Sequence, residues 1–291
     1  MATSEHTRLI ERLSDRHEER VLNALNSLEE RISDIVIDAP TDGEALSDPA
    51  WAIGARVEIE SSFRDEFLSE ADALVREYDD AVASLNAYYK QLGAEFVVSD
   101  AIVANLKRVS FQGFEDIASR FSNELANELY QNTLAGRPKS EAIRSIRQKI
   151  NGVYMESDKA EINRLVEIAK GDGDEAARAL ELLHREYAAD RTGNNMRRYA
   201  SQMVNDSLTQ FDSSVNLTAA RELGITKFKY VGDTVSDTRD WCRRHLNKTY
   251  TEEEIREMWS SNSWQGKAPG DPFVVRGGYN CRHQWEAVIE D

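Results

Sequence analysis

The sequence has few of the residues that staple small proteins, and it lacks the long apolar runs that cross membranes. Its 291 residues include two cysteines and five prolines. Two cysteines cannot build a disulfide framework, and few prolines with 30% charged residues favour long, solvated helices. No apolar run reaches the roughly 18 residues of a membrane span, and the first residues contain no apolar core of a signal peptide. We therefore expect neither a membrane partner nor secretion.

Basic residues are scarce in most of the chain. The net charge is −16, and residues 1–225 hold 26 Lys and Arg against 41 Asp and Glu. Residues 226–291 hold 10 against 11 and are almost neutral. An acidic body repels phosphate backbones, so nucleic acid is not expected to wrap along it. A protein partner with basic patches fits this charge better.

Residues 5–37 are expected to form one helix with a narrow apolar seam. The members of the seam recur at spacings of 4, 3, 4 and 3, and they are Val21, Leu25, Leu28, Ile32 and Ile35. This spacing is typical of a helix–helix contact. Because the rest of the stretch is polar, the seam needs a second helix from this chain or from another. We interpret it as a partner-binding seam, and the pattern allows these helices to fold back or to project.

Helical patterns continue through most of the chain. They cover residues 51–91, 99–134, 139–150, 157–170, 174–188 and 194–223, and a break or hinge is expected at 39–49. The predicted fold class is mainly α, with a long helical body of bundle or coiled-coil type followed by a small C-terminal α+β module. The predicted parts are an N-terminal arm over 1–50, a helical body over 51–223 and the module over 224–291.

The character of the sequence changes near residue 224. The segment TKFKYVGD alternates like a strand, and four of the five tryptophans follow it. A helix near 251–260, a glycine-rich loop and a closing strand complete the predicted module, with VVRGGYN at 274–280 as a sharp turn into that strand. A module of this size has little core of its own, so it needs a staple or packing against the helices.

Both cysteines stand close to a histidine. Cys242 and His245 are three residues apart and share a face of a helical turn, whereas Cys281 and His283 are two apart and share a face of a strand. Two thiolates and two imidazoles make a sound tetrahedral zinc set. The four residues are therefore the candidate metal ligands, with zinc as the candidate ion.

Other readings of this quartet stay open. The cysteines can be small packed residues, or they can form a disulfide after the chain leaves a reducing compartment. The histidines can merely hydrogen-bond to loops. A hydrolase or nuclease could instead use a cysteine as nucleophile, a histidine as base and Asp237 or Asp240 as orienter. No oxyanion-hole or nucleophile-elbow signature accompanies the quartet, so the chain is predicted not to be an enzyme.

The residues just before Cys242 suggest a turn. Asp237, Thr238 and Arg239 form a short segment in which a side-chain oxygen can cap the backbone and the arginine can reach back to close the turn. We expect Arg239 to be buried or partly buried, because the module is otherwise short of internal ties.

Two segments of the C-terminal third form a distinctive pair, YVGDTVSDTRDWC at 230–242 and RGGYNCRHQWEAV at 276–288. In these motifs the chain resembles the phage head morphogenesis family, the Mu F-like minor head proteins, over about residues 203–289. This chain has Asp-Thr-Arg where many members show Arg-Thr, and His283 where many have another residue. The motif positions are Asp237, Thr238, Arg239, Cys242, Asn280, Cys281, Arg282 and Trp285.

Membership of this family implies a structural role. It implies a minor capsid component at the portal vertex or in the head interior, made in the host cytoplasm, that assists head assembly and DNA packaging or ejection. Its partners would be the portal protein and other capsid or connector subunits. A zinc-stapled interaction module without a viral role is the remaining alternative.

Overall fold

The structure is a computed structural model that describes most of the chain. The described residues are 4–94, 97–154, 160–169, 175–176, 178–179, 182–183, 191–192, 195–235 and 238–289. The predicted helix over 174–188 and the motif residue Asp237 lie largely or wholly outside them. Within the described part of the chain, none of the helices combines the length and apolar character that a membrane span requires.

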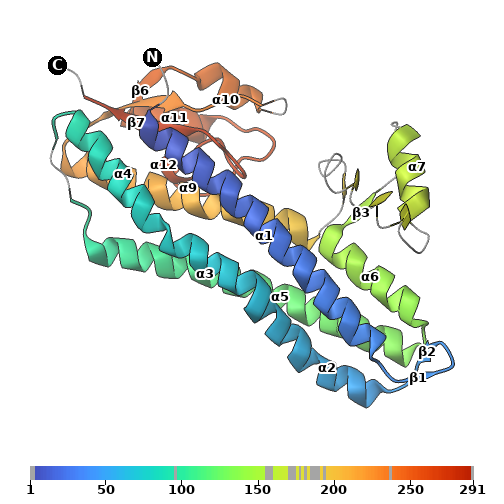
Figure 1. Ribbon diagram of the computed structural model, residues 1–291. Coiled ribbons are helices and arrows are strands. Elements are labelled where there is room, and N and C mark those ends of the chain that lie inside the picture. The colour runs from blue at the N-terminus through green and yellow to red at the C-terminus, as the bar shows by residue number, and fades with distance from the viewer. Residues whose placement is uncertain are drawn as a thin grey trace. The chain divides into compact units, whose positions relative to one another are not determined.

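The fold is mainly α with a small C-terminal α+β module, as the sequence predicts (Figure 1). The helical part contains α1 (Glu5–Ile37), α2 (Pro49–Ser62), a π-helix (Phe63–Leu68), α3 (Ser69–Arg76), α4 (Tyr78–Gln91), α5 (Asp100–Leu134), α6 (Lys139–Asn151), α7 (Ala160–Ala169) and α9 (Met196–Glu222). Two short antiparallel pairs join β1 (Thr41–Asp42) to β2 (Ala45–Leu46) and β3 (Val153–Tyr154) to β4 (Arg191–Thr192).

Most predicted helices are confirmed, and two connections differ. The stretch predicted as one helix over 51–91 is divided by the π-helix, in which Phe63 and Phe67 are buried, and again at Glu77 between α3 and α4. The break predicted at 39–49 contains the β1–β2 hairpin, in which Gly43 adopts a φ of 63°. This left-handed conformation is unfavourable for residues with a Cβ, which explains the glycine at the turn.

The chain divides into two compact units that are each built from separated segments. Unit 1 contains Met1–Leu28, Glu60–Arg120 and Ala200–Asp291, and unit 2 contains Glu29–Ile59 and Phe121–Tyr199. This grouping differs from the three consecutive parts predicted. Long helices bring distant segments side by side, so sequence order does not delimit the units. The predicted start of the module near residue 224 nevertheless follows the end of α9.

In unit 1 the first part of α1 contacts α9, α3 and Glu77, the residue that follows α3. Glu18 accepts hydrogen bonds from Ser201 and from Asn205, whose Nδ2 lies 3.1 Å from the carboxylate. Arg20 forms ion pairs with Glu70 at 2.7 Å and with Glu77 at 3.5 Å. The polar flanks of the helix are therefore held on two sides by the chain itself.

The predicted partner-binding seam is not a free surface. Val21, Leu25 and Leu28 in unit 1 and Ile32 in unit 2 are each 0% exposed, and Ile35 is half-buried. Other residues of the chain cover this stripe, because removing its apolar side chains from water is favourable. The structure thus corrects the expectation of a partner at this seam.

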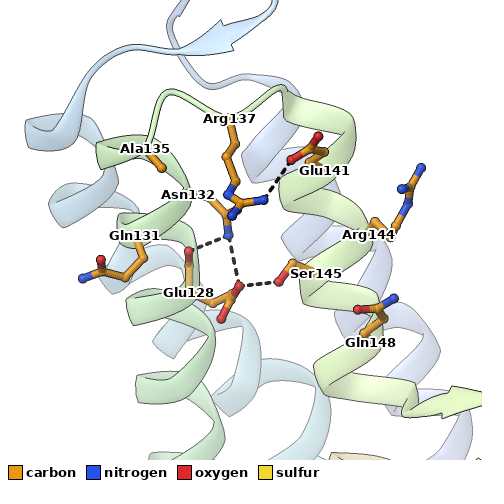
Figure 2. Close-up of a pocket in the computed structure, with 9 residues that line it drawn as sticks. All are labelled: Glu128, Gln131, Asn132, Ala135, Arg137, Glu141, Arg144, Ser145 and Gln148. Atoms are coloured by element: carbon orange, nitrogen blue, oxygen red, sulfur yellow. Dashed lines mark hydrogen bonds and ion pairs between the residues drawn. The ribbon is translucent and has the colours of Figure 1, made fainter.

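Unit 2 packs the end of α1, the hairpin and α2 with the end of α5 and α6. The hairpin is tied to the loop before α6 by the Leu46 N–H, which donates to the Arg137 carbonyl at 2.9 Å. A polar pocket of about 660 Å³ lies between α5 and α6 (Figure 2). Its charges are largely satisfied within its own walls, since Arg137 pairs with Glu141 and Ser145 donates to Glu128.

The C-terminal module is a three-stranded antiparallel sheet with short helices. The strand order is β6 (Thr249–Thr251), β5 (Lys227–Val231) and β7 (Gln284–Val288). The predicted strands at both ends of the module are β5 and β7, which pair Tyr230 with Trp285. The helices are α10 (Asp240–His245), α11 (Glu252–Ser261) and α12 (Pro272–Val275). The predicted helix near 251–260 is α11, which begins with a capping box formed by Thr251 and Glu254.

The start of α1 packs against β7 and α9 (Figure 1). The Thr7 hydroxyl donates to the Glu286 carboxylate at 2.6 Å, and His6 Nε2 lies 2.9 Å from the buried Asp212 carboxylate. Burial alone lowers the pKa of His6, but the charges of Asp212 and Glu286 and a hydrogen bond to Asp212 outweigh burial and raise it. The imidazolium form is therefore favoured in the folded protein.

We expect the free energy of unfolding to decrease as pH rises from 6.5 through the raised pKa of His6. Below 6.5 the ion pair with Asp212 contributes fully, and above the folded-state pKa a neutral imidazole leaves that carboxylate without its cation. Urea unfolding midpoints across this range measure the effect. His6→Gln should remove this part of the pH dependence, and an unchanged profile in His6→Gln would contradict the assignment.

Candidate metal centre

Three of the four predicted ligands converge in the C-terminal module. One ligand atom from each of Cys242, Cys281 and His283 lies within 4.8 Å of the others. The three side chains are 1%, 4% and 4% exposed. Cys242 comes from α10, whereas Cys281 and His283 lie in the segment that leads into β7. Both cysteines are free thiols.

The local backbone places the two cysteines face to face. Gly277 occupies the turn before Cys281, and its N–H donates to Cys281 Sγ at 3.2 Å. A Cβ at this position would lie 2.4 Å from Cys242 Sγ and 2.8 Å from Cys281 Sγ. No side chain can approach so closely, so this glycine is what allows the turn to reach both sulfurs.

Tyr230 of β5 lies beneath the group. Its hydroxyl is 3.5 Å from Cys242 Sγ and 3.4 Å from Cys281 Sγ, and its ring stacks on His283 at 5.2 Å. Burial, together with the neighbouring thiols, raises the pKa of Tyr230 well above its usual value. The phenol therefore stays protonated and can donate to a sulfur that carries negative charge.

The pKa values of the two thiols are shifted in opposite directions. The hydrogen bond from Cys242 lowers the pKa of Cys281 against the opposing effect of burial, and His283 and Arg276 lower it further. The same bond, together with burial, raises the pKa of Cys242. The thiolate form is therefore favoured at Cys281 over Cys242. His283 Nδ1 lies 3.7 Å from the Cys281 sulfur, and His283 Nε2 is buried without a hydrogen-bond partner among the described residues.

Arg276 is a buried cation that sequence reasoning did not single out. Its side chain is 0% exposed, and it donates to the Cys281 carbonyl at 3.0 Å and to the Val274 carbonyl at 3.1 Å. It also reaches the Ser213 hydroxyl of α9 at 3.4 Å. Burial raises the pKa of Asp206, and the charge of Arg276 opposes part of this effect. The Asp206 carboxylate accepts the Asn280 N–H at 2.8 Å. The signal in the sequence was an arginine between two valines and two glycines.

His245 is not part of the group, which corrects the predicted four-ligand set. Its Nδ1 lies 2.8 Å from the Tyr250 hydroxyl, and its ring packs at 4.6 Å from the Trp241 ring. These two aromatic residues hold the imidazole near β6. Cys242 and His245 share a face of α10, but the contacts of the imidazole with Tyr250 and Trp241 decide where it points.

Asp237 of the predicted turn lies outside the described residues, and a different arginine, Arg243, bonds to the segment before α10. The Val235 N–H donates to the Thr238 hydroxyl at 2.7 Å, and Arg243 donates to the Thr238 carbonyl at 2.8 Å. Arg239 is half-buried and instead donates to the Tyr279 carbonyl at 2.6 Å. Gly266 packs on its guanidinium, since a Cβ there would lie 2.8 Å from Nη2. Arg239 thus ties two loops of the module together.

The remaining motif residues connect the module to its surroundings. Asn280 adopts a φ of 53°, and Trp285 Nε1 donates to the Pro272 carbonyl at 3.2 Å. Arg282 pairs with Asp15 of α1 at 3.2 Å. All of these contacts hold segments in place.

A pocket opens onto the three grouped residues. It has a volume of about 320 Å³, and Cys242, Cys281 and His283 all line it. Its other charged residues are Asp233, Arg239 and Arg282. The three residues are almost fully buried, and together they form part of the wall of this pocket.

Comparisons with protein-family models, with curated proteins and with solved structures find no match to this chain. The function must accordingly be argued from the motifs and the geometry.

Replacing Arg276 should destabilise the protein strongly. Arg276→Met keeps much of the volume but removes a charge that favours the Asp206 carboxylate and leaves the Val274 carbonyl and the buried Cys281 carbonyl without their donor, so we expect a loss of about 2–5 kcal/mol in the free energy of unfolding. Arg282→Met, which removes only surface ion pairs with Asp15 and Glu18, should cost less than about 1 kcal/mol. Urea unfolding measures both.

Asp206→Asn in the Arg276→Met background should recover part of the loss, because it removes the uncompensated charge. Equal stabilities for Arg276→Met and Arg282→Met would contradict a structural role for the buried guanidinium.

Proposed function

We propose that the chain is a structural minor capsid protein of a tailed phage, of the head-morphogenesis type. It would associate with the portal vertex and assist head assembly and DNA packaging or ejection. The observation that carries the proposal is the convergence of the two motif segments, 230–242 and 276–288, on one buried Cys–His group. Their sulfurs share Tyr230 and Gly277 as neighbours, although 38 residues separate Cys242 from Cys281 in the numbering.

The contacts of the motif residues support a structural role. Arg239 joins two loops, Asn280 binds Asp206 of α9, and Trp285 bonds to the residue that begins α12. Each of these is a tie within the module or from the module to a helix. Contacts of this kind give the two short motifs, which are far apart in the sequence, a common structural role.

The charge of the helical part supports a basic protein partner. Residues 1–225 carry 41 acidic and 26 basic residues. Because the apolar seam of α1 is covered, such a partner would meet the acidic outer faces of the helices. Charge complementarity of this kind favours docking on a basic subunit over contact with DNA along the same surface.

We also propose that Cys242, Cys281 and His283 hold a zinc ion. Tetrahedral coordination with ordinary zinc–sulfur and zinc–nitrogen lengths separates a sulfur from a nitrogen ligand by about 3.6 Å. The separation of Cys281 Sγ from His283 Nδ1 is 3.7 Å. When bound, zinc would tie α10 to the segment before β7, which is the staple that a small module needs.

A thiol hydrolase or nuclease is the second proposal. Cys281 beside His283 supplies a thiolate and a potential base in an open pocket. The two proposals differ in what His283→Ala should do. A zinc ligand should lose metal and stability together, whereas a catalytic base should lose turnover while the fold stays intact.

We expect the purified chain to bind one zinc ion. Cys242→Ser, Cys281→Ser and His283→Ala should each weaken zinc binding by more than about tenfold, because even groups outside the ligand set cost that much. His245→Ala is the matched control and should bind zinc like the parent chain. Metal analysis and competition with a chromophoric chelator give the affinities.

A chelator should lower the melting temperature of the parent chain and of His245→Ala, but not of Cys281→Ser. Absence of zinc binding by the parent chain, or equal loss in His245→Ala, would rule out this ligand set.

A tagged chain made in its natural cells should recover a ring-forming portal subunit at a fixed ratio. The physical reason is the predicted complementarity between the acidic helices and a basic ring. An unrelated protein of similar negative charge, carrying the same tag, controls for non-specific capture, and mass spectrometry identifies the partners. A monomer that retains portal subunits no better than this control would overturn the proposed role.

A further inference from the structure

The proposed zinc centre has three ligands from the chain, whereas zinc in proteins is usually four-coordinate. His245, the predicted fourth ligand, is held by Tyr250 and Trp241 instead. Among the described residues no other histidine, cysteine or carboxylate joins the group within the same 4.8 Å. The fourth position must therefore be filled in another way.

The geometry indicates which way the fourth position faces. On the inner side the sulfurs are covered by Tyr230 and by the Gly277 backbone. On the outer side all three ligand residues line the pocket of about 320 Å³. A pocket of this size is at the small end of sites that bind small molecules. The pocket is therefore the side from which a fourth ligand would reach the centre.

The charges around the pocket select the kind of ligand. A zinc ion bound by two thiolates has no net charge, so the charged residues of the pocket wall determine which ligand is favoured. Arg239 donates to a neutral carbonyl and forms no ion pair among the described residues, whereas Arg282 is partly offset by Asp15 and Glu18. Asp233 is the opposing carboxylate on the wall, and Glu11 of α1 lies close enough to Asp233 and His283 to interact with their charges. The charges of the whole wall therefore do not favour an anion, and among the described wall residues the guanidinium of Arg239 is the one group that favours a small anion beside it.

We infer that the fourth coordination position of the Cys242–Cys281–His283 centre opens into this pocket and takes a small anion from outside the chain. The inference rests on the proposed zinc site and deepens it, because an open position distinguishes an exchangeable centre from a closed structural one. Arg239 is the positioning residue for that anion, and the two thiolates and the imidazole hold the metal.

The test replaces zinc by Co²⁺ in the full chain and follows the visible absorption bands that report ligand number and type. Azide is the anionic probe and imidazole is the neutral one. We expect a four-coordinate thiolate spectrum that shifts with both probes. His245→Ala should behave like the parent chain, since this side chain lies outside the centre.

Arg239→Gln should weaken azide binding by about three- to thirtyfold while imidazole binding stays the same, because only the anion loses a favourable charge. Equal effects on both probes would overturn the anion preference. The imidazole titration also controls for damage to the fold, since a collapsed pocket would lose both ligands.

Two results would overturn the open position while leaving the zinc site in place. If neither probe changes the cobalt spectrum of the parent chain or of Asp233→Asn, the centre is closed. A spectrum that responds only in Asp233→Asn means that Asp233 fills the position. Failure of the chain to bind Co²⁺ or zinc at all would instead overturn the metal centre itself, and the inference with it.

Discussion

The C-terminal module is organised around a cation that has no access to water. Arg276 is fully buried, and a buried guanidinium is tolerated only where acceptors meet its donors. The carbonyls of Val274 and Cys281 and the hydroxyl of Ser213 meet its two terminal nitrogens, whereas Nε has no partner among the described residues. Satisfying the terminal nitrogens fixes the turn over 276–281, and this turn sets the positions of Gly277 and Cys281. The thiol pair, the pocket and the candidate metal centre all depend on that arrangement.

The module is stabilised from two sides that use different chemistry. On the side of the helices, α4 and α9 bond to β7 through Tyr88 to the Ala287 carbonyl and Asn216 to the Trp285 carbonyl. On the other side, the Cys–His group links α10 to the segment before β7. A small sheet that bonds to helices on one side and carries a buried Cys–His group on the other needs little core of its own. This division is consistent with a chain whose acidic helices meet partners while the module serves as a folded anchor.

The same donors that stabilise charge on Cys281 also prepare it to bind a metal. The Gly277 N–H, the Tyr230 hydroxyl and the Cys242 thiol surround this sulfur, and a thiolate is the form in which cysteine binds zinc. A thiolate is also a nucleophile, so these contacts alone serve both the staple and the hydrolase proposals. What separates them is the behaviour of His283 and the ligand that occupies the pocket.

The sequence alone determined the long helices and the approximate location of the site. The period of α1, α5 and α9 is a local property of the chain, and the clustering of cysteine with histidine pointed to residues 242–283. Only the tertiary structure decided that Arg276 is buried, that the seam of α1 is covered by the chain and that His245 turns toward Tyr250. Each of these depends on which distant groups meet in space, and no periodicity within one segment encodes the contacts that another segment supplies.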